Sequence, residues 1–233
     1  MASNKNKKQN SPDLYPIFHL VSKNPTIIHW LKTSYFVTKT MSLTEHGFKH
    51  ADFTAKRAEE IAQKLGYNDK IRDLCLAAGF CHDIGNFLSR TYHHYLGSLL
   101  FSDLFKEQLT IEDLTVIMQA ITNHDKEEMK FTSPVSAIVV IADKSDVRRN
   151  RVLTNGLEIQ NNIHDRVNYA AIENKLYVND KAKTITLAIK IDTKYVPIME
   201  YFEIFTKRMN YCRLASNYLG YHFNLIINNF KLL

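Results

Sequence analysis

The stretch LCLAAGFCHDIG, residues 74–85, joins an apolar segment to a histidine and an aspartate. Its first eight residues are small or apolar, a run too short to span a membrane and suited to a buried helix. Adjacent side chains on a helix diverge by about 100°, so His82 and Asp83 approach one point only where the helix ends. We expect Gly85 to supply that end. A lone histidine–aspartate pair is typical of a solvated helix terminus, so its interpretation depends on the residues that accompany it.

The composition is that of an ordinary soluble globular protein, with 45% hydrophobic and 23% charged residues in a chain of 233. This length fits one domain, or one with a smaller appendage. Residues 1–13 are polar and lack the apolar core of a signal peptide, and no apolar run approaches the roughly 18 residues of a membrane span. Three cysteines without a C-x-x-C pair favour reduced thiols and a cytoplasmic location. The net charge of +6 weakly favours a phosphate-bearing ligand.

Helical spacing of apolar residues dominates the first two thirds of the chain. Helix starts are expected at Pro25, Thr44, Asn68, His93 or His94, Thr110 and Ser133. Beyond about residue 175 the apolar residues alternate, which predicts a β-hairpin, then a long helix from about 196 to 220, and a final strand over 221–227. The expected fold class is therefore mainly α, a helical bundle with a small C-terminal α+β appendage.

Histidines and aspartates gather at the ends of the predicted helices. Six of the ten histidines lie between residues 46 and 124. His46 and His50, four residues apart on one helical face, are as typical of two surface imidazoles as of a metal site. Asp143 follows the apolar run 139–142, which draws its carboxylate inward, and a buried carboxylate is costly unless a cation meets it. That cation is a metal or a basic neighbour such as Lys144 or Arg148.

The order His50, His82-Asp83, Asp143 resembles the H…HD…D signature of the HD-domain metal-dependent phosphohydrolases. The segment ADKSD at 142–146, with its trailing arginines, is similar to their closing motif, and the resemblance covers roughly residues 46–151. It implies that these four residues ligate one metal and that Asp83 bridges to a second. For the second metal, the resemblance implies the ligands His94 and His124. The next residue, Asp125, is a further candidate ligand and a departure, because relatives often have another histidine at that position. His93 competes with His94, because the sequence does not decide between them.

The resemblance departs at Asn86, where many relatives have a lysine near the substrate phosphate. The residues that can replace that positive charge are Lys144, Arg90, Arg148, Arg149 and Arg151. A solvated basic loop is the alternative for the arginines. The expected catalytic residues are Asp83 and Lys144. Imidazole with carboxylate favours one or two ions of Mn, Fe, Co, Ni or Zn, which would activate a water for attack on phosphorus.

The expected domains are a disordered or extended tail over 1–23, an HD-type helical metal-binding domain over 24–159 and the α+β appendage over 160–233. The expected function is hydrolysis of a phosphate ester or anhydride, first of a nucleotide polyphosphate, since the residue set resembles that of HD-type hydrolases acting on diadenosine tetraphosphate. The alternatives are a mixed-valent di-iron oxygenase and a nucleotide- or RNA-binding regulatory module.

Expectations for partners follow from the same reading. The expected partner is a small phosphorylated substrate; a membrane is not expected, nucleic acid is not favoured, and a homodimer and the role of the appendage stay open. At His164-Asp165, a helix-capping or hydrogen-bonding role is favoured over metal ligation.

Overall fold

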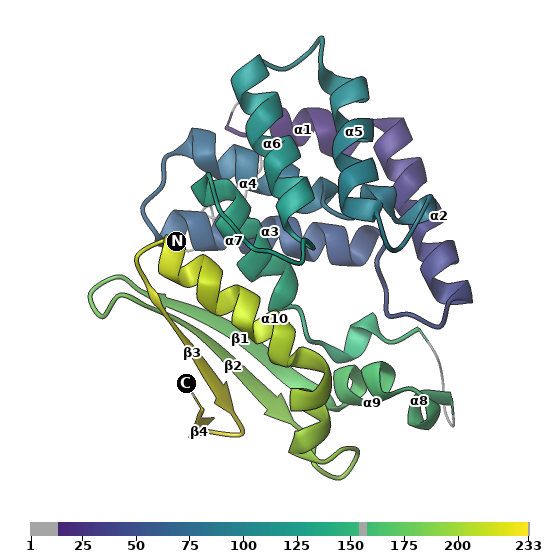
Figure 1. Cartoon of the computed structure of the whole chain (residues 1–233), viewed down its shortest axis with the longest axis vertical. Helices are drawn as coiled ribbons and strands as arrows, with labels where there is room; N and C mark the ends of the chain where they lie inside the picture. Colours follow the sequence, from purple (N-terminus) through teal and green to yellow (C-terminus); the bar gives the residue numbers. More distant parts are fainter. Residues whose placement is uncertain (1–13, 154–157, 233) are drawn as a thin grey trace, which may run out of the picture.

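The structure, a computed structural model, describes residues 14–153 and 158–232. A helical bundle is followed by a smaller part in which one long helix packs on a sheet (Figure 1). The bundle contains α1 (Pro16–Lys23), α2 (Pro25–Thr40), α3 (Phe48–Lys64), α4 (Asp69–Cys81), the 3₁₀ helix η1 (Ile84–Phe87), α5 (His93–Phe105), α6 (Ile111–Asn123) and α7 (Pro134–Lys144). This arrangement confirms the expected fold class. Among the described residues, no helix is both long and apolar enough to cross a membrane.

The chain after the bundle forms the appendage. It contains η2 (Arg149–Arg151), α8 (Glu158–Asn161), α9 (Ile163–Ala170), β1 (Ala171–Asn179), β2 (Thr184–Ile191), α10 (Ile198–Tyr218), β3 (His222–Ile227) and β4 (Phe230–Lys231). The sheet order is β1-β2-β3-β4, with β1 and β2 antiparallel and β2 and β3 parallel. The predicted hairpin and final strand are thus present, and β4 adds a short strand that the sequence did not predict.

Side-chain caps fix several helix starts where the sequence predicted them. The side chains of Asn24, Asn68, Thr110 and Ser133 accept hydrogen bonds from backbone N–H groups of the first turn. The helix expected to begin at Thr44 begins instead at Phe48. There the carboxylate of Glu45 accepts from the N–H groups of Gly47 and His50, at 2.9 and 2.8 Å, and so performs the capping role.

The tail predicted for residues 1–23 is wrong over residues 14–23, while residues 1–13 lie outside the described part. Pro16–Lys23 forms α1, with Tyr15 and Val21 buried in the core. The buried carboxylate of Asp73 accepts hydrogen bonds from Ile17 N and Phe18 N, at 2.9 and 2.7 Å. These bonds satisfy two of the free N–H groups at the start of α1 and attach it to α4.

Gly85 has a different role from the predicted one. Helix α4 ends at Cys81, and Gly85 lies inside η1, so it does not terminate the helix. A Cβ at Gly85 would lie 2.2 Å from the carbonyl oxygen of His93. Glycine is needed here because the backbone of η1 passes directly against the start of α5. This close approach brings the end of α4 and the start of α5 together.

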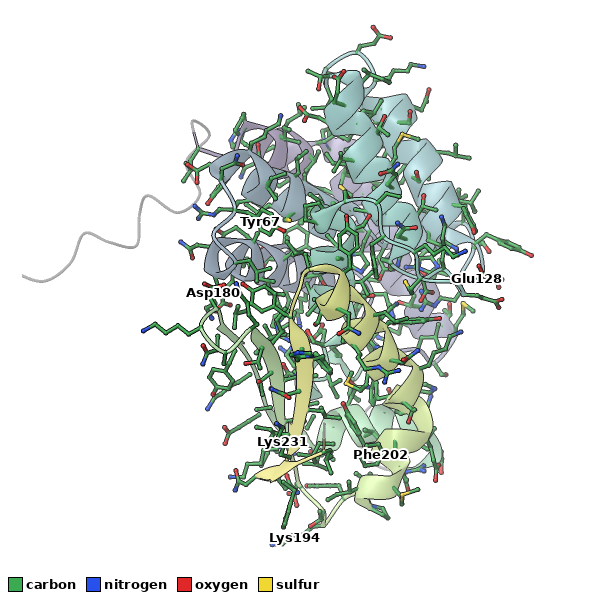
Figure 2. All side chains as sticks on the ribbon, turned by 60° about the vertical axis from the view of Figure 1, so that its left-hand side comes forward. Tyr67, Glu128, Asp180, Lys194, Phe202 and Lys231 are labelled. Atoms are coloured by element: carbon green, nitrogen blue, oxygen red, sulfur yellow. The ribbon has the colours of Figure 1, made fainter. Side chains whose placement is uncertain are left out.

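Helix α10 connects the two parts of the molecule. It packs on α7 of the bundle and on β3 of the sheet, and it lies between them in Figure 1. The alternating residues Ile185, Leu187 and Ile189 of β2 are buried and belong to the same apolar core as the bundle. Figure 2 shows the molecule turned by 60°, with Phe202 of α10 and Lys231 of β4 at the end away from the bundle. The appendage is therefore packed against the helix that carries Asp143.

Candidate metal centre

Six buried residues from five segments of the bundle converge on one region. His50 comes from α3, His82 and Asp83 from the end of α4, His93 from the start of α5, His124 from the end of α6, and Asp143 from α7. Each is at most 4% exposed. Their ligand atoms form overlapping groups in which all atoms lie within 4.8 Å of one another. Burial of imidazoles and carboxylates at such short distances is energetically costly unless a cation lies among them.

Backbone and carboxylate acceptors fix the tautomer of the four histidines. The Nδ1 atom lies 2.8 Å from Gly79 O in His82, 2.7 Å from Arg90 O in His93, and 2.6 Å from Ile121 O in His124. In His50 it lies 2.7 Å from the carboxylate of Asp146. Because these oxygens only accept, each Nδ1 carries the hydrogen, and each neutral ring presents an unprotonated Nε2 to the cluster.

The unprotonated nitrogens face each other in two pairs. His50 Nε2 lies 3.1 Å from His82 Nε2, and His93 Nε2 lies 3.0 Å from His124 Nε2. Two lone pairs at this separation repel unless a proton or a metal ion lies between them or beside them. This is the arrangement of histidines whose Nε2 atoms ligate a metal and whose Nδ1 atoms are held by outer partners.

Asp83 lies between the two histidine pairs. Its Oδ2 is 3.3 Å from His82 Nε2, and its Oδ1 is 3.2 Å from His93 Nε2. Within the described part of the chain, the buried Oδ2 has no hydrogen-bond partner. Asp143 Oδ1 lies 3.2 Å from His50 Nε2 and completes the first group. The donor set could therefore hold one or two metal ions, with Asp83 belonging to both of the groups around it.

The electrostatics keep the carboxylates of the centre charged, as metal ligation requires. Burial acts to raise the pKa of Asp83, but His82, His124 and His93 hold that pKa well below its usual value. Burial lowers the pKa of His124 to about 4. The pKa of His82 is raised, although burial opposes it, because Asp83 and Asp143 favour positive charge at that ring. The centre thus attracts a cation.

Asp146 supports the centre from behind. Its carboxylate accepts from Nδ1 of His50, and Arg148 and Arg151 pair with it. Burial acts to raise the pKa of Asp146, but Arg151 and the hydrogen bonds from His50 and Arg148 lower it. Asp146 therefore stays charged and fixes the orientation of His50. The sequence placed Asp146 in the closing motif without assigning it this role.

The second group contains His93 where the sequence prediction placed His94. The His94 ring packs on Tyr95, with ring centroids 4.2 Å apart, and its buried Nδ1 has no hydrogen-bond partner among the described residues. Asp125 is at the edge, with Oδ2 3.8 Å from His93 Nε2 and Oδ1 2.7 Å from Lys144 Nζ. The structure thus places His93 Nε2 beside Asp83 and His124, while His94 belongs to a separate group of possible ligands with His93 and Asp125.

Only one of the four predicted phosphate-binding arginines reaches the centre. Arg90 Nη1 lies 3.2 Å from His93 Nε2 and 3.9 Å from Asp83 Oδ1. The structure directs the other three elsewhere. Arg148 stacks on Phe53 and pairs with Asp146, Arg149 donates to the carbonyl of Tyr169, and the buried Arg151 donates to the carbonyl of Glu45. These three arginines stabilise the fold around η2 and do not line the pocket. The remaining predicted residue, Lys144, pairs with Asp125 and Asp143.

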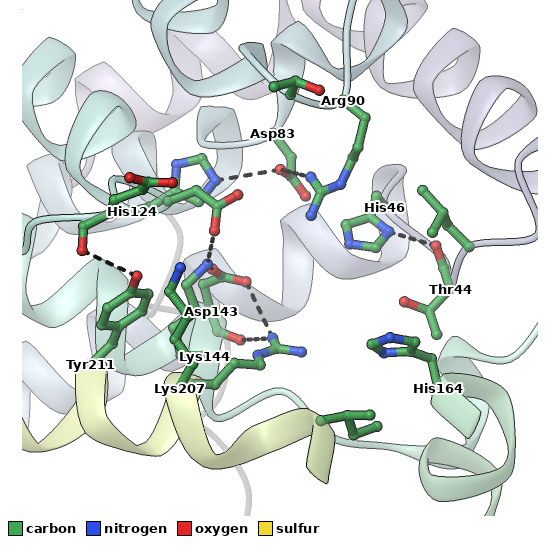
Figure 3. Close-up of a pocket in the computed structure, with 16 residues that line it drawn as sticks. Thr44, His46, Asp83, Arg90, His124, Asp143, Lys144, His164, Lys207 and Tyr211 are labelled. Carbon is green, nitrogen blue, oxygen red and sulfur yellow. Dashed lines mark hydrogen bonds and ion pairs between the residues drawn. The ribbon is translucent and has the colours of Figure 1, made fainter. Parts of the chain in front are cut away.

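A cavity of about 410 Å³ opens from the metal centre (Figure 3). Asp83, His124 and Asp143 lie at its metal-binding side, and Arg90 and Lys144 also line it. The remaining walls come from the loop before α3, from α9 and from α10, through Thr44, His46, His164, Ile204, Lys207, Arg208 and Tyr211 among others. The cavity residues of α10 were not predicted from the sequence, because the prediction for this helix used only its apolar stripe. The one local signal is the pair Lys207-Arg208 between the buried Phe205 and Met209.

His164 also lines this cavity. The helix cap expected at His164-Asp165 is instead Asn162, whose side chain accepts from His164 N at 2.9 Å. The backbone N–H of His164 is therefore the group that is capped, and the ring of His164 lines the pocket, opposite α10 in Figure 3.

Comparison with known proteins agrees with the geometry. Residues 47–148 match the family model described as HD domain. The matched segment carries the metal centre. For this segment, the match supports the HD superfamily of metal-dependent phosphohydrolases. Domains of that superfamily bind divalent metals. The chain is also similar to the uncharacterized protein MJ1020 of Methanocaldococcus jannaschii, with 25% identity over 169 residues. The alignment covers 63% of this chain, and the chain spans 64% of that relative's length.

Proposed function

We propose that this protein is a two-metal phosphohydrolase that cleaves a phosphate ester or anhydride of a nucleotide. The observation that carries the proposal is the pair of facing Nε2 couples with Asp83 between them, at one side of a cavity of about 410 Å³. A cavity of this size is in the range of small-molecule sites. Three free, buried cysteines are consistent with a cytosolic place of action.

The residues divide between two metal sites. His50, His82, Asp83 and Asp143 would hold the first ion, and Asp83, His93 and His124 the second, with Asp125 at its edge. Mixed imidazole and carboxylate ligands favour Mn, Fe, Co, Ni or Zn over Mg. When bound, such ions lower the pKa of a coordinated water and neutralise the oxygens of a phosphoryl group.

The chain's own cations would orient the substrate. Arg90 lies beside Asp83 at the cavity wall, where its guanidinium can donate two hydrogen bonds to phosphate oxygens. Lys144 Nζ lies 2.7 Å from Asp125 Oδ1 and 2.9 Å from Asp143 Oδ2, so it holds both carboxylates in position. All the proposed ligands except Asp125 are buried, which keeps bulk water away from their charges and strengthens their interactions.

Removal of Asp83 tests the proposal. Protein purified without added metal is first analysed for its metal content, then loaded with Mn²⁺ or Fe²⁺ and assayed for phosphate or mononucleotide release from nucleotides. Dinucleoside tetraphosphates are the first substrates to try, because of the resemblance in the residue set. Asp83→Ala should reduce turnover by more than the roughly 10–100-fold typical of outer-sphere residues.

Asp103→Ala is the control, because this exposed aspartate of α5 pairs, among the residues that the structure describes, with Lys106 alone. It should retain full activity. Normal turnover by Asp83→Ala would disprove the metal mechanism. Consumption of oxygen by the iron-loaded protein, without release of phosphate, would favour the di-iron oxygenase instead.

A further inference from the structure

Helix α10 brings positive charge to the cavity from outside the segment that matches the HD domain. We propose that Lys207 and Arg208 form a second anion subsite, so that the substrate carries at least two linked phosphates, one at the metal centre and the next on α10. The inference rests on the proposed function for the first phosphate.

Arg208 lies directly beside the metal centre. Its Nη2 donates to the carbonyl oxygen of Asp143 at 3.0 Å and lies 3.8 Å from Asp143 Oδ1. The guanidinium also packs over Phe205, at 5.1 Å from the ring centroid. Its buried Nε has no hydrogen-bond partner within the described residues. A buried donor without an acceptor is energetically costly, so a ligand that supplies an acceptor to Nε would remove this cost.

Lys207 lies next to Arg208 and is exposed to the cavity. Its Nζ lies 5.6 Å from the ring centroid of Tyr211, whose hydroxyl donates to Glu127 O at 3.4 Å. Over residues 14–153 and 158–232, no carboxylate oxygen lies within 4.0 Å of Lys207 Nζ. Its charge is therefore available to a ligand.

The other lysine of the cavity is not available in this way, because Lys144 already pairs with Asp125 and Asp143. Of the carboxylates that line the cavity, Asp125 and Asp143 pair with Lys144 and Asp83 belongs to the metal centre, while Glu127 adds negative charge in the neighbourhood of Lys207. Figure 3 shows Lys207 and Tyr211 rising from α10 along one wall, beside Lys144, with His46 and His164 across the opening. On the α10 side, Lys207 thus supplies positive charge that no carboxylate within 4.0 Å pairs with among the described residues, and Arg208 lies beside it with a single carboxylate contact, to Asp143 at 3.8 Å.

A linked pair of phosphates fits this distribution of charge. Arginine and lysine both bind phosphate oxygens, and a cavity of about 410 Å³ is far larger than one phosphate group. In hydrolysis of an anhydride, the water oxygen bonds to the phosphorus at the metal centre and the bridging P–O bond breaks. The electron pair stays with the leaving phosphate, and the proton of the water is released to solvent. Lys207 and Arg208 would stabilise the charge on that leaving phosphate.

The test compares one phosphate with two. Binding of orthophosphate and of methylenediphosphonate, whose P–C–P bridge is not hydrolysed, is measured by calorimetry on the metal-loaded protein at one fixed free Mn²⁺ concentration. The parent protein should bind the diphosphonate about 10-fold or more tightly than orthophosphate, as expected for hydrogen bonds between charged groups. The variant Lys207→Gln/Arg208→Gln should lose this preference and keep its affinity for orthophosphate.

Lys190→Gln/Arg213→Gln is the matched control, with the same change of charge outside the cavity. Lys190 is exposed on β2, Arg213 is exposed on α10 and donates to Asn210, and neither lines this cavity. This variant should keep the preference for the diphosphonate. Should the double variant at 207 and 208 misfold, Lys207→Gln is tested alone, because substitution of an exposed side chain changes the free energy of unfolding by only about 0.5 kcal/mol or less. It should lose a measurable part of the preference.

The two proposals fail in different ways. Retention of the diphosphonate preference by both α10 variants would overturn the second subsite, whether or not the parent protein hydrolyses nucleotides. Loss of the preference, in a protein that releases no phosphate from any nucleotide, would support the subsite and disprove the hydrolase. A parent protein that binds the two probes equally would also overturn the subsite.

Discussion

His93 and His94 are neighbours in sequence with different surroundings. His93 Nε2 lies 3.2 Å from Asp83 Oδ1, whereas His94 packs on Tyr95. We therefore expect His93→Ala to reduce the bound metal from two equivalents toward one, and His94→Ala to retain both. Elemental analysis after dialysis against metal-free buffer measures the difference. The reverse ranking would restore His94 as the ligand and contradict the arrangement described here.

The sequence could name most of the centre but could not choose between these two histidines. His50, His82, Asp83 and Asp143 are predicted because their order resembles the HD signature. The choice of His93 depends on the carbonyl of Arg90, which holds its Nδ1, and so on the path of the loop before α5. That path is a tertiary feature, and adjacent helical positions differ by about 100° in direction.

At the scale of elements, the contact between η1 and α5 controls the position of His93. A Cβ on residue 85 would lie 2.2 Å from His93 O and 2.7 Å from Gly97 N, both backbone atoms. Gly85→Ala should therefore push α5 away and destabilise the protein by about 1–3 kcal/mol, the usual cost of overpacking. It should also reduce the metal content, because His93 moves with α5. Urea denaturation and elemental analysis measure the two effects.

Gly66→Ala separates the loss of stability from the loss of metal. Gly66 follows α3 at φ +79° with no atom near its missing Cβ, so alanine strains only the backbone there. It should cost about 1 kcal/mol and leave the metal content unchanged. If Gly85→Ala keeps both stability and metal, the close approach does not position the site.

Elements with local signals could be predicted, and those stabilised from a distance could not. Helices beginning after Asn24, Asn68, Thr110 and Ser133 are capped by residues two or three positions away. Helix α1 is held by Asp73, which is 56 residues from Ile17 in sequence. For the same reason the role of α10 could not be predicted, since its contact to the centre joins Arg208 and Asp143, which are 65 positions apart.

At the scale of the whole molecule, one apolar core runs from the bundle into the appendage. It contains all three cysteines, Cys75 and Cys81 in α4 and Cys212 in α10, each fully buried. Burial raises the pKa of the Cys212 thiol to about 12 and also raises the pKa of the other two thiols. The folded protein therefore keeps these thiols protonated at pH values where the unfolded chain ionises them.

This difference predicts a loss of stability at alkaline pH. A thiol whose folded pKa is raised contributes its full stability below the unfolded pKa of 9.0, and loses it as the pH rises toward the folded value. Between pH 8 and 10, one such thiol should lower the free energy of unfolding by about 1.4 kcal/mol.

Urea denaturation under reducing conditions measures the decline, which should be smaller by about this amount in Cys212→Ala. Ser216→Ala, a buried non-titrating residue one turn further along α10, should keep the parent slope. Parallel declines in Cys212→Ala and the parent would show that Cys212 ionises freely in the folded state, and that α10 does not close the core against the bundle.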